Sequence, residues 1–224
     1  MIEKFIMAGR TALHVCDSQQ GERCVVLLHG YLESMFVWDD FVPLLYKRVR
    51  VVTLDLPGHG ISEVRGECHS MEYLADVVRD ALQALGIARC TLVGHSMGGY
   101  VAMDIQRLYP ETVAGLALCD TMAASDGVGG ENRLKMADAA EQTNSVEPVM
   151  HFAQPADGDS TVKKTPEFIA TMTGWINEQN PAGLAWRQRM TYGRPELGAV
   201  PETISAPSLV VSGELDPSSN PSVM

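Results

Sequence analysis

The segment from residue 92 to residue 99, Leu-Val-Gly-His-Ser-Met-Gly-Gly, constrains the fold more than any other part of this sequence. An apolar run typical of a strand ends here, a helix begins, and Ser96 lies between them. A turn this sharp brings strand and helix so close that the residues two before and two after the serine must be very small. Gly94 and Gly98 occupy those positions, so the segment predicts a strand, a tight turn and a helix that together expose a serine hydroxyl.

Apolar runs and helix-like stretches alternate from about residue 25 to residue 120. The runs are rich in leucine and β-branched residues, which is typical of strands buried on both faces by helices. Strands are expected at 25–28, 49–54, 90–93, 113–118 and 208–211, helices at 34–46, 70–85 and 98–109, and a short hairpin at 5–7 and 11–15. This alternation predicts an α/β fold, with a mostly parallel sheet and helices on both faces.

Polar residues follow the ends of these predicted strands. In open parallel sheets, ligands bind outside the carboxyl ends of the strands. The residues that follow strand ends are His29 and Gly30, residues 55–60, Ser96, Asp120 and Asp216. We therefore expect them to meet at one rim of the sheet, which favours a single site over scattered loops.

Composition changes after Asp120. Residues 125–130 are typical of a flexible hinge, and residues 131–198 contain helix-like segments that are interrupted by prolines at 148, 155, 166 and 181. Strand-like sequence returns at residues 204–212. We therefore expect a core at 1–122, a helical cap at 123–199 and a continuation of the core at 200–224. Inserted between two strand ends of the rim, the cap would cover the site and supply apolar walls.

Composition and charge narrow the classes of function. The formal net charge of −11 would repel nucleic acid and acidic membrane surfaces. No apolar run approaches the ~18 residues of a membrane-spanning helix, and the first residues lack a secretion signal, so we expect a cytoplasmic protein. The cysteines are odd in number and scattered, which predicts reduced thiols. Cys68 and His69 form an isolated pair, and no spacing in the sequence indicates a metal site.

The sequence resembles the α/β-hydrolase superfamily, specifically its serine esterases and lipases with a helical cap. Four motifs in the right order carry the resemblance: His29-Gly30, residues 55–62, residues 94–99 and residues 212–216. The resemblance implies that Ser96 is a nucleophile and that the backbone N–H groups of Tyr31 and Met97 form an oxyanion hole. Gly30, Gly94 and Gly98 would be structural, and no cofactor or metal is implied.

The resemblance also implies an acid that orients a catalytic histidine. Asp216 holds the corresponding position after the last predicted strand, with Asp120 as an alternative acid and a plain surface turn as the alternative interpretation of Asp216. His29 and His59 belong to structural turns of the family. His95 adjoins Ser96 on a sharp turn, where neighbouring side chains point apart, so it is not the expected base. The remaining histidines are His14 in the hairpin, His69 before a helix and His151 in the cap.

The catalytic histidine itself is the one departure from the family pattern. In this fold it follows the acid in the chain, whereas the sequence holds no histidine after His151. The final helix and strand of the fold are missing as well. We interpret the sequence as truncated before the histidine loop, with an inactive relative as the alternative. The 224-residue polypeptide is expected to be a very weak catalyst, since removing a triad histidine costs about 10⁶ in turnover.

Two functional hypotheses follow. The first is a serine hydrolase that cleaves carboxylic esters or related acyl compounds through an acyl-enzyme. Thioesters, lactones, amides and carbon–carbon bonds stay open as substrates, while a serine nucleophile counts against dehalogenases and epoxide hydrolases, which use a carboxylate. The second is a non-catalytic member of the same fold that binds a small apolar ligand beneath the cap. A small molecule is the expected partner in both, and the oligomeric state is left open.

Overall fold

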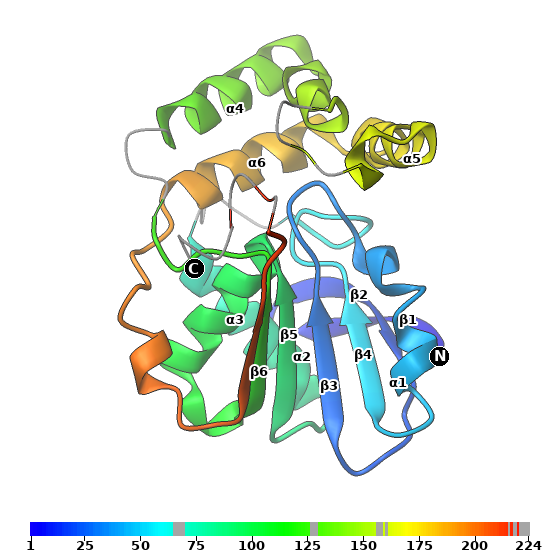
Figure 1. The fold of residues 1–224 in the computed structure, drawn as a ribbon, viewed down its shortest axis with the longest axis vertical. Helices are drawn as coiled ribbons and strands as arrows, with labels where there is room; N and C mark the ends of the chain where they lie inside the picture. The colour runs from blue at the N-terminus through cyan, green and yellow to red at the C-terminus, as the bar shows by residue number, and fades with distance from the viewer. Residues whose placement is uncertain are drawn as a thin grey trace.

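A seven-stranded sheet forms the centre of the protein (Figure 1). The computed structural model describes residues 1–64, 70–125, 130–155, 159, 161–214, 216 and 219. In this part of the chain the strand order is β1-β2-β4-β3-β5-β6-β7. The strands are β1 (Ile2–Ala8), β2 (Thr11–Asp17), β3 (Cys24–Leu28), β4 (Arg50–Leu54), β5 (Cys90–His95), β6 (Val113–Cys119) and β7 (Ser208–Val211).

The strand pairing brings the carboxyl ends of the parallel strands to one rim. β1 pairs with β2, and β2 with β4, in antiparallel fashion, whereas the other pairs are parallel. The predicted hairpin and the mostly parallel sheet are thereby confirmed. Leu28 aligns with Leu54 on one side and with Gly94 on the other, so β3, β4 and β5 end at the same level. The residues that follow these strands therefore emerge together.

Side chains of the central strands alternate between two packed faces. Leu28 contributes to the main core with α2 (Met71–Ala84) and α3 (Met97–Leu108). Its neighbour Leu27 points the other way and packs in a second cluster with α1 (Val42–Leu45). Because both faces of β3 are covered, the strand has a continuous apolar sequence rather than an alternating one.

The helix expected at residues 34–46 is the clearest error in the prediction of elements. This stretch forms a 3-10 helix, η1 (Met35–Trp38), and then the short α1. Pro43 lies in the first turn of α1. Proline has no backbone N–H and favours the start of a helix, so it begins a new helix instead of extending η1. The predictions for α2 and α3 are confirmed to within about a residue at each end.

The last strand forms at the predicted residues, and its side chains are exposed in the described part of the chain. β7 covers the predicted residues 208–211, but Leu209, Val210 and Val211 are 59%, 57% and 45% exposed. The strand lies at the end of the described sheet and pairs with β6 alone.

Between β6 and β7 the described chain forms helices and no strand. We call this part the α4–α6 segment; it contains α4 (Glu131–Thr143), η4 (Glu147–Ala153), η5 (Val162–Lys164), α5 (Pro166–Asn177) and α6 (Pro181–Tyr192). In Figure 1 its three α-helices lie beyond the carboxyl ends of the strands. Pro166 and Pro181 begin α5 and α6, because a proline in the first turn loses no hydrogen bond. Short 3-10 helices, η2 (Pro110–Thr112) and η6 (Pro201–Thr203), complete the fold.

The described residues bear on the cysteines and on membrane-spanning helices, and they exclude most of the predicted hinge. Cys16, Cys24, Cys90 and Cys119 are free thiols. None of the helices in the described ranges has the length and apolar character needed to cross a bilayer. Cys68, His69 and residues 126–129 of the predicted hinge lie outside the described residues.

Candidate active site

Ser96 forms the strained link between β5 and α3. Its φ and ψ are 49° and −113°, a conformation that a residue with a side chain rarely adopts. The Ser96 N–H donates to the Cys119 carbonyl at 2.9 Å, and the Ser96 carbonyl accepts from the Gly99 N–H at 2.9 Å and the Thr121 hydroxyl at 2.8 Å. The neighbouring strand β6 and the segment after it therefore fix the backbone of this turn.

Glycines let three backbone segments meet beside Ser96. A methyl group on Gly94 would lie 2.4 Å from the Gly98 carbonyl oxygen, and one on Gly98 would lie 2.3 Å from the Leu28 carbonyl oxygen. Both atoms belong to backbone, which cannot rotate aside. The close packing of β3, β5 and α3 thus requires glycine at both positions.

A cavity of about 630 Å³ opens in front of Ser96. The rim of the sheet contributes Tyr31, His95, Ser96, Asp120 and Asp216 to its lining. The α4–α6 segment supplies an opposing wall that includes Arg133, Phe152, Lys163, Phe168, Met172 and Trp175. The cavity therefore has polar groups on the side of the sheet and several large apolar side chains on the side of the helices.

Two backbone N–H groups flank the serine turn. Met97 is the first residue of α3, and Tyr31 follows His29 and Gly30 in the loop after β3. Neither N–H donates a hydrogen bond within the described part of the chain. The Met97 N–H also lies at the amino end of a 12-residue helix, where the helix dipole favours negative charge. Both groups remain available to an oxygen atom bound in the cavity.

Two aspartates lie at the neighbouring strand ends. Asp216 accepts hydrogen bonds from the Ser219 N–H at 3.2 Å and the Ser219 hydroxyl at 3.0 Å. Asp120, with a φ of 43°, accepts from the Gly213 N–H at 2.7 Å. Asp120 therefore ties the end of β6 to the loop after β7. Both carboxylates line the same cavity as Ser96.

The histidines at the strand ends are engaged in structural contacts. The His29 ring accepts from the Leu56 N–H at 3.0 Å through Nε2 and contacts the Gly30 carbonyl through Nδ1. His59 stacks edge to face on His29, with ring centroids 4.7 Å apart. Burial, followed by the positive charge of Arg187, lowers the pKa of His59 well below 6.5. His59 is therefore a neutral ring that packs in the core.

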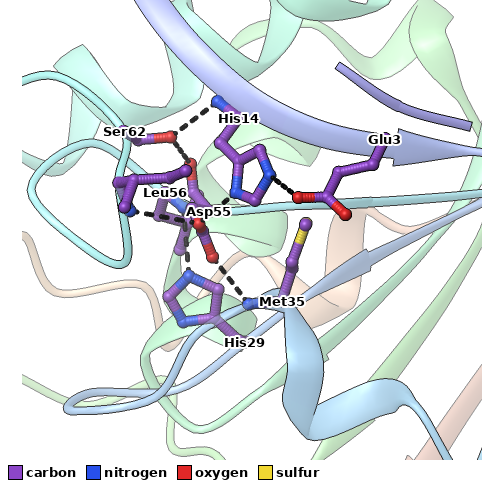
Figure 2. A network of polar contacts seen from close by, with 8 residues as sticks. Glu3, His14, His29, Met35, Asp55, Leu56 and Ser62 are labelled. Carbon is purple, nitrogen blue, oxygen red and sulfur yellow. Dashed lines mark hydrogen bonds and ion pairs between the residues drawn. The ribbon is translucent and has the colours of Figure 1, made fainter. Parts of the chain in front are cut away.

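Figure 2 shows how the 55–62 motif holds the loop after β3. Asp55 accepts from the Met35 N–H at 2.8 Å through one carboxylate oxygen and contacts His14 Nδ1 at 2.8 Å through the other. His14 Nε2 in turn contacts Glu3 at 2.8 Å. The Ser62 hydroxyl donates to the Asp55 carbonyl at 2.7 Å. The network joins β1, β2, β4 and the loop that carries Tyr31, and it places His14 in a structural role.

Glu33 is a site residue that sequence reasoning missed. One of its oxygens, Oε2, accepts from the Gly30 N–H at 2.6 Å and lies 3.1 Å from His95 Nδ1. Burial by itself raises the pKa of Glu33, but His95 and the Gly30 N–H outweigh burial, so the net shift is downward. Burial likewise lowers the pKa of His95, but Glu33 outweighs it and raises the value above 6.5. The one sign of this pair in the sequence is the position of Glu33, an acidic residue in a largely apolar loop.

The described residues contain no group of three or more His, Cys, Asp or Glu side chains arranged to hold a metal ion. His151, in η4, is exposed and contacts the ring of Phe152, with centroids 4.3 Å apart. His151 is not among the residues that line the cavity in front of Ser96.

Comparison with curated proteins finds relatives that share part of the chain. A dihydrolipoyllysine-residue acetyltransferase component of an acetoin cleaving system from Pseudomonas putida is 35% identical over 139 residues, which is 61% of this chain and 37% of that protein. A serine hydrolase-like protein from Danio rerio is 40% identical over 101 residues, 44% of this chain and 31% of that protein. The chain thus spans about a third of the length of these relatives.

Comparison with solved structures covers nearly the whole chain. A thermophilic esterase from Thermogutta terrifontis, solved with malate bound, is 29% identical with a TM-score of 0.86, over 99% of this chain and 84% of that one. An enol-lactonase from Burkholderia xenovorans, 24% identical with a TM-score of 0.81, covers 98% of this chain and 85% of its own, and shows the shared fold. The sequence profile of the alpha/beta hydrolase fold matches residues 23–142, more than half of the sequence. The chain therefore belongs to the α/β-hydrolase fold family.

Proposed function

We propose that the protein is a serine hydrolase that cleaves carboxylic esters or related acyl compounds through an acyl-enzyme. The observation that carries the proposal is Ser96 itself, held in a strained turn at the amino end of α3 and open to a cavity of about 630 Å³. A serine fixed in this way, with its backbone groups already hydrogen-bonded, presents its hydroxyl to a bound carbonyl carbon.

The first step is attack of the Ser96 oxygen on the substrate carbonyl carbon. The carbonyl oxygen becomes an oxyanion, which accepts hydrogen bonds from the Met97 and Tyr31 N–H groups. This role of the two N–H groups is supported because neither donates a hydrogen bond to another group within the described residues. A donor of this kind is worth roughly 2.7–4 kcal/mol to the transition state. The alcohol then leaves, and water releases the acyl group from Ser96.

The proton of the Ser96 hydroxyl needs a base. His95 is a poor choice, because its Nδ1 is already engaged by the Glu33 carboxylate at 3.1 Å, which raises the pKa of the ring. We assign the base to a histidine carried by the protein beyond residue 224, oriented by Asp216, as the family resemblance implies. Asp120 is assigned to positioning, since its carboxylate holds the Gly213 N–H.

The α4–α6 segment, within the proposed cap at 123–199, is assigned to substrate selection. Its Phe152, Phe168, Met172 and Trp175 line the cavity and suit an apolar acyl or alcohol group. The name of the solved structure that is 29% identical, an esterase, favours esters over the other acyl compounds. The name of the zebrafish relative, a serine hydrolase-like protein, agrees with serine as nucleophile.

Labelling with a fluorophosphonate probe tests the proposal on the full-length protein. We expect the probe to form a covalent adduct with Ser96, identified by peptide mass spectrometry, and Ser96→Ala to lose both labelling and the hydrolysis of p-nitrophenyl esters. A folded full-length protein whose Ser96 stays unlabelled, and which binds ligands in the cavity without turning them over, would overturn the proposal in favour of a binding protein.

A further inference from the structure

A partly buried ion pair joins the two chain segments that carry the proposed oxyanion-hole donors. We propose that Glu33 and His95 are positioning residues, which hold the Tyr31 and Met97 N–H groups at the right separation for the oxyanion. The inference rests on the proposed function and goes one step beyond it, because it names the residues that set the geometry of the hole.

One carboxylate oxygen makes the connection. Glu33 Oε2 receives the Gly30 N–H at 2.6 Å and contacts His95 Nδ1 at 3.1 Å, although Glu33 and His95 are 62 positions apart in the sequence. Gly30 is directly followed by Tyr31, and His95 is followed by Ser96 and Met97. A bond at this point therefore fixes the residue before one donor and the turn before the other.

The sheet alone does not hold these two segments together. The paired register of β3 and β5 ends with Leu28 opposite Gly94. Past this point the chain continues into the loop after β3 on one side and into the serine turn on the other. The side-chain link between Glu33 and His95 lies beyond the last backbone pair, at the level of the proposed reaction.

Partial burial shields the ion pair between Glu33 and His95 from solvent, so the pair depends on the charge of both side chains. The Glu33 side chain is only 11% exposed and that of His95 is 32% exposed. The charged and titratable groups that act on His95 are Glu33, Asp120 and Asp216, and His29 also acts on Glu33. Since all three carboxylates favour the imidazolium, we expect the link to be strongest below the raised pKa of His95 and to weaken as pH rises through it.

Two variants separate charge from shape in the full-length protein. Glu33→Gln keeps the size of the side chain and removes its charge. His95→Asn keeps an N–H donor close to the position of Nδ1 and removes the imidazole ring that titrates. Asp17→Asn is the matched control, because Asp17 forms a buried ion pair with Arg50 at 2.8 Å, next to Val52 in β4 and away from the cavity.

We expect Glu33→Gln to lower kcat for a p-nitrophenyl ester and the rate of fluorophosphonate labelling by about 10- to 100-fold, with KM changed by less than about threefold. Because the ion pair weakens as pH rises through the pKa of His95, we expect wild-type kcat to fall at alkaline pH. This fall should move to lower pH in Glu33→Gln and should disappear in His95→Asn. Asp17→Asn should lower the melting temperature and leave kcat and its pH profile as in the wild type.

The outcomes separate the inference from the function on which it rests. If wild-type Ser96 is not labelled, the proposed function fails. If Ser96 is labelled and Glu33→Gln reacts at the wild-type rate with an unchanged pH profile, the function stands and the positioning role is wrong. Should Glu33→Gln not fold, His95→Asn decides through the pH profile alone, since an alkaline fall that persists in this variant overturns the inference.

Discussion

At the scale of single residues, Gly98 decides how closely α3 approaches the sheet. A methyl group on Gly98 would lie 2.3 Å from the Leu28 carbonyl oxygen, which belongs to the backbone of β3. We expect Gly98→Ala to lower the free energy of unfolding by about 3 kcal/mol, at the upper end for an overpacked core, because backbone must shift to make room. Urea unfolding of variant and wild type near neutral pH measures this difference.

The same substitution at Gly174 is the control. Gly174 is exposed in the middle of α5, and a methyl group there would meet no atom within 4 Å. Alanine favours a helix over glycine, so Gly174→Ala should raise the free energy of unfolding by about 0.5–1 kcal/mol. Similar losses for both variants would show that crowding at Leu28 is not the cause.

The burial of His59 predicts that the stability of the folded protein depends on pH. Its pKa lies well below 6.5 in the folded protein, first because of burial and then because of Arg187. The unfolded chain therefore binds a proton near pH 6.5 that the folded chain does not, so stability is present above this pH and is lost as pH falls below it. We expect the melting temperature to drop between neutral pH and about pH 5.5, and to drop less in His59→Gln. An equally steep drop in this variant would contradict the assignment.

At the scale of elements, the helices of the α4–α6 segment depend on how they begin. The Asn180 side chain accepts from the N–H groups of Ala182 at 2.9 Å and Gly183 at 3.3 Å, and so caps α6 just before Pro181. Asn180→Ala removes the acceptor and leaves these donors to water. We expect a loss of about 1 kcal/mol in the free energy of unfolding, measured by urea titration.

Asn177 offers a control of the same residue type. It is the exposed last residue of α5. Asn177→Ala should change the free energy of unfolding by less than about 0.5 kcal/mol. If the two variants lose the same stability, capping by Asn180 does not explain the loss.

Elements were predictable where one local preference dominated. β7 appears at the predicted residues, because a run of valine and leucine favours a strand regardless of its neighbours. α2 is also predictable, since Ser70 caps its start by accepting from the Tyr73 N–H. The stretch at 34–46 failed, because its apolar residues suit a helix while Pro43 starts a new one.

At the scale of the whole molecule, the rim of the sheet could be predicted and its internal bonds could not. A parallel sheet brings every strand end to one edge, so the order of the strands hardly matters for placing Ser96, Asp120 and Asp216 around one cavity. The contact between Glu33 and His95 depends on the conformation of two loops 62 positions apart, which no local pattern encodes.

The cavity between the rim of the sheet and the α4–α6 segment leads to a prediction about substrate specificity. Phe152, from η4, lines the cavity and packs edge to face on Tyr31, with ring centroids 5.8 Å apart. Under the proposed function, Phe152→Ala removes an apolar wall from the substrate, and such a contact is worth about 1–3 kcal/mol. We expect kcat/KM for a p-nitrophenyl ester with an aromatic acyl group to fall about tenfold, mainly through KM, and that for the acetate to change much less.

Val162→Ala is the control for this measurement, because Val162 lies in the same segment, is 63% exposed and does not line the cavity. It should leave both esters unaffected. The acyl group would be bound elsewhere than against the α4–α6 segment if Phe152→Ala lowered kcat/KM for the two esters by the same factor. The α4–α6 segment selects the substrate only if the decrease in kcat/KM grows with the size of the acyl group. An equal decrease for both esters would instead reflect a displaced Tyr31 and a weakened oxyanion hole.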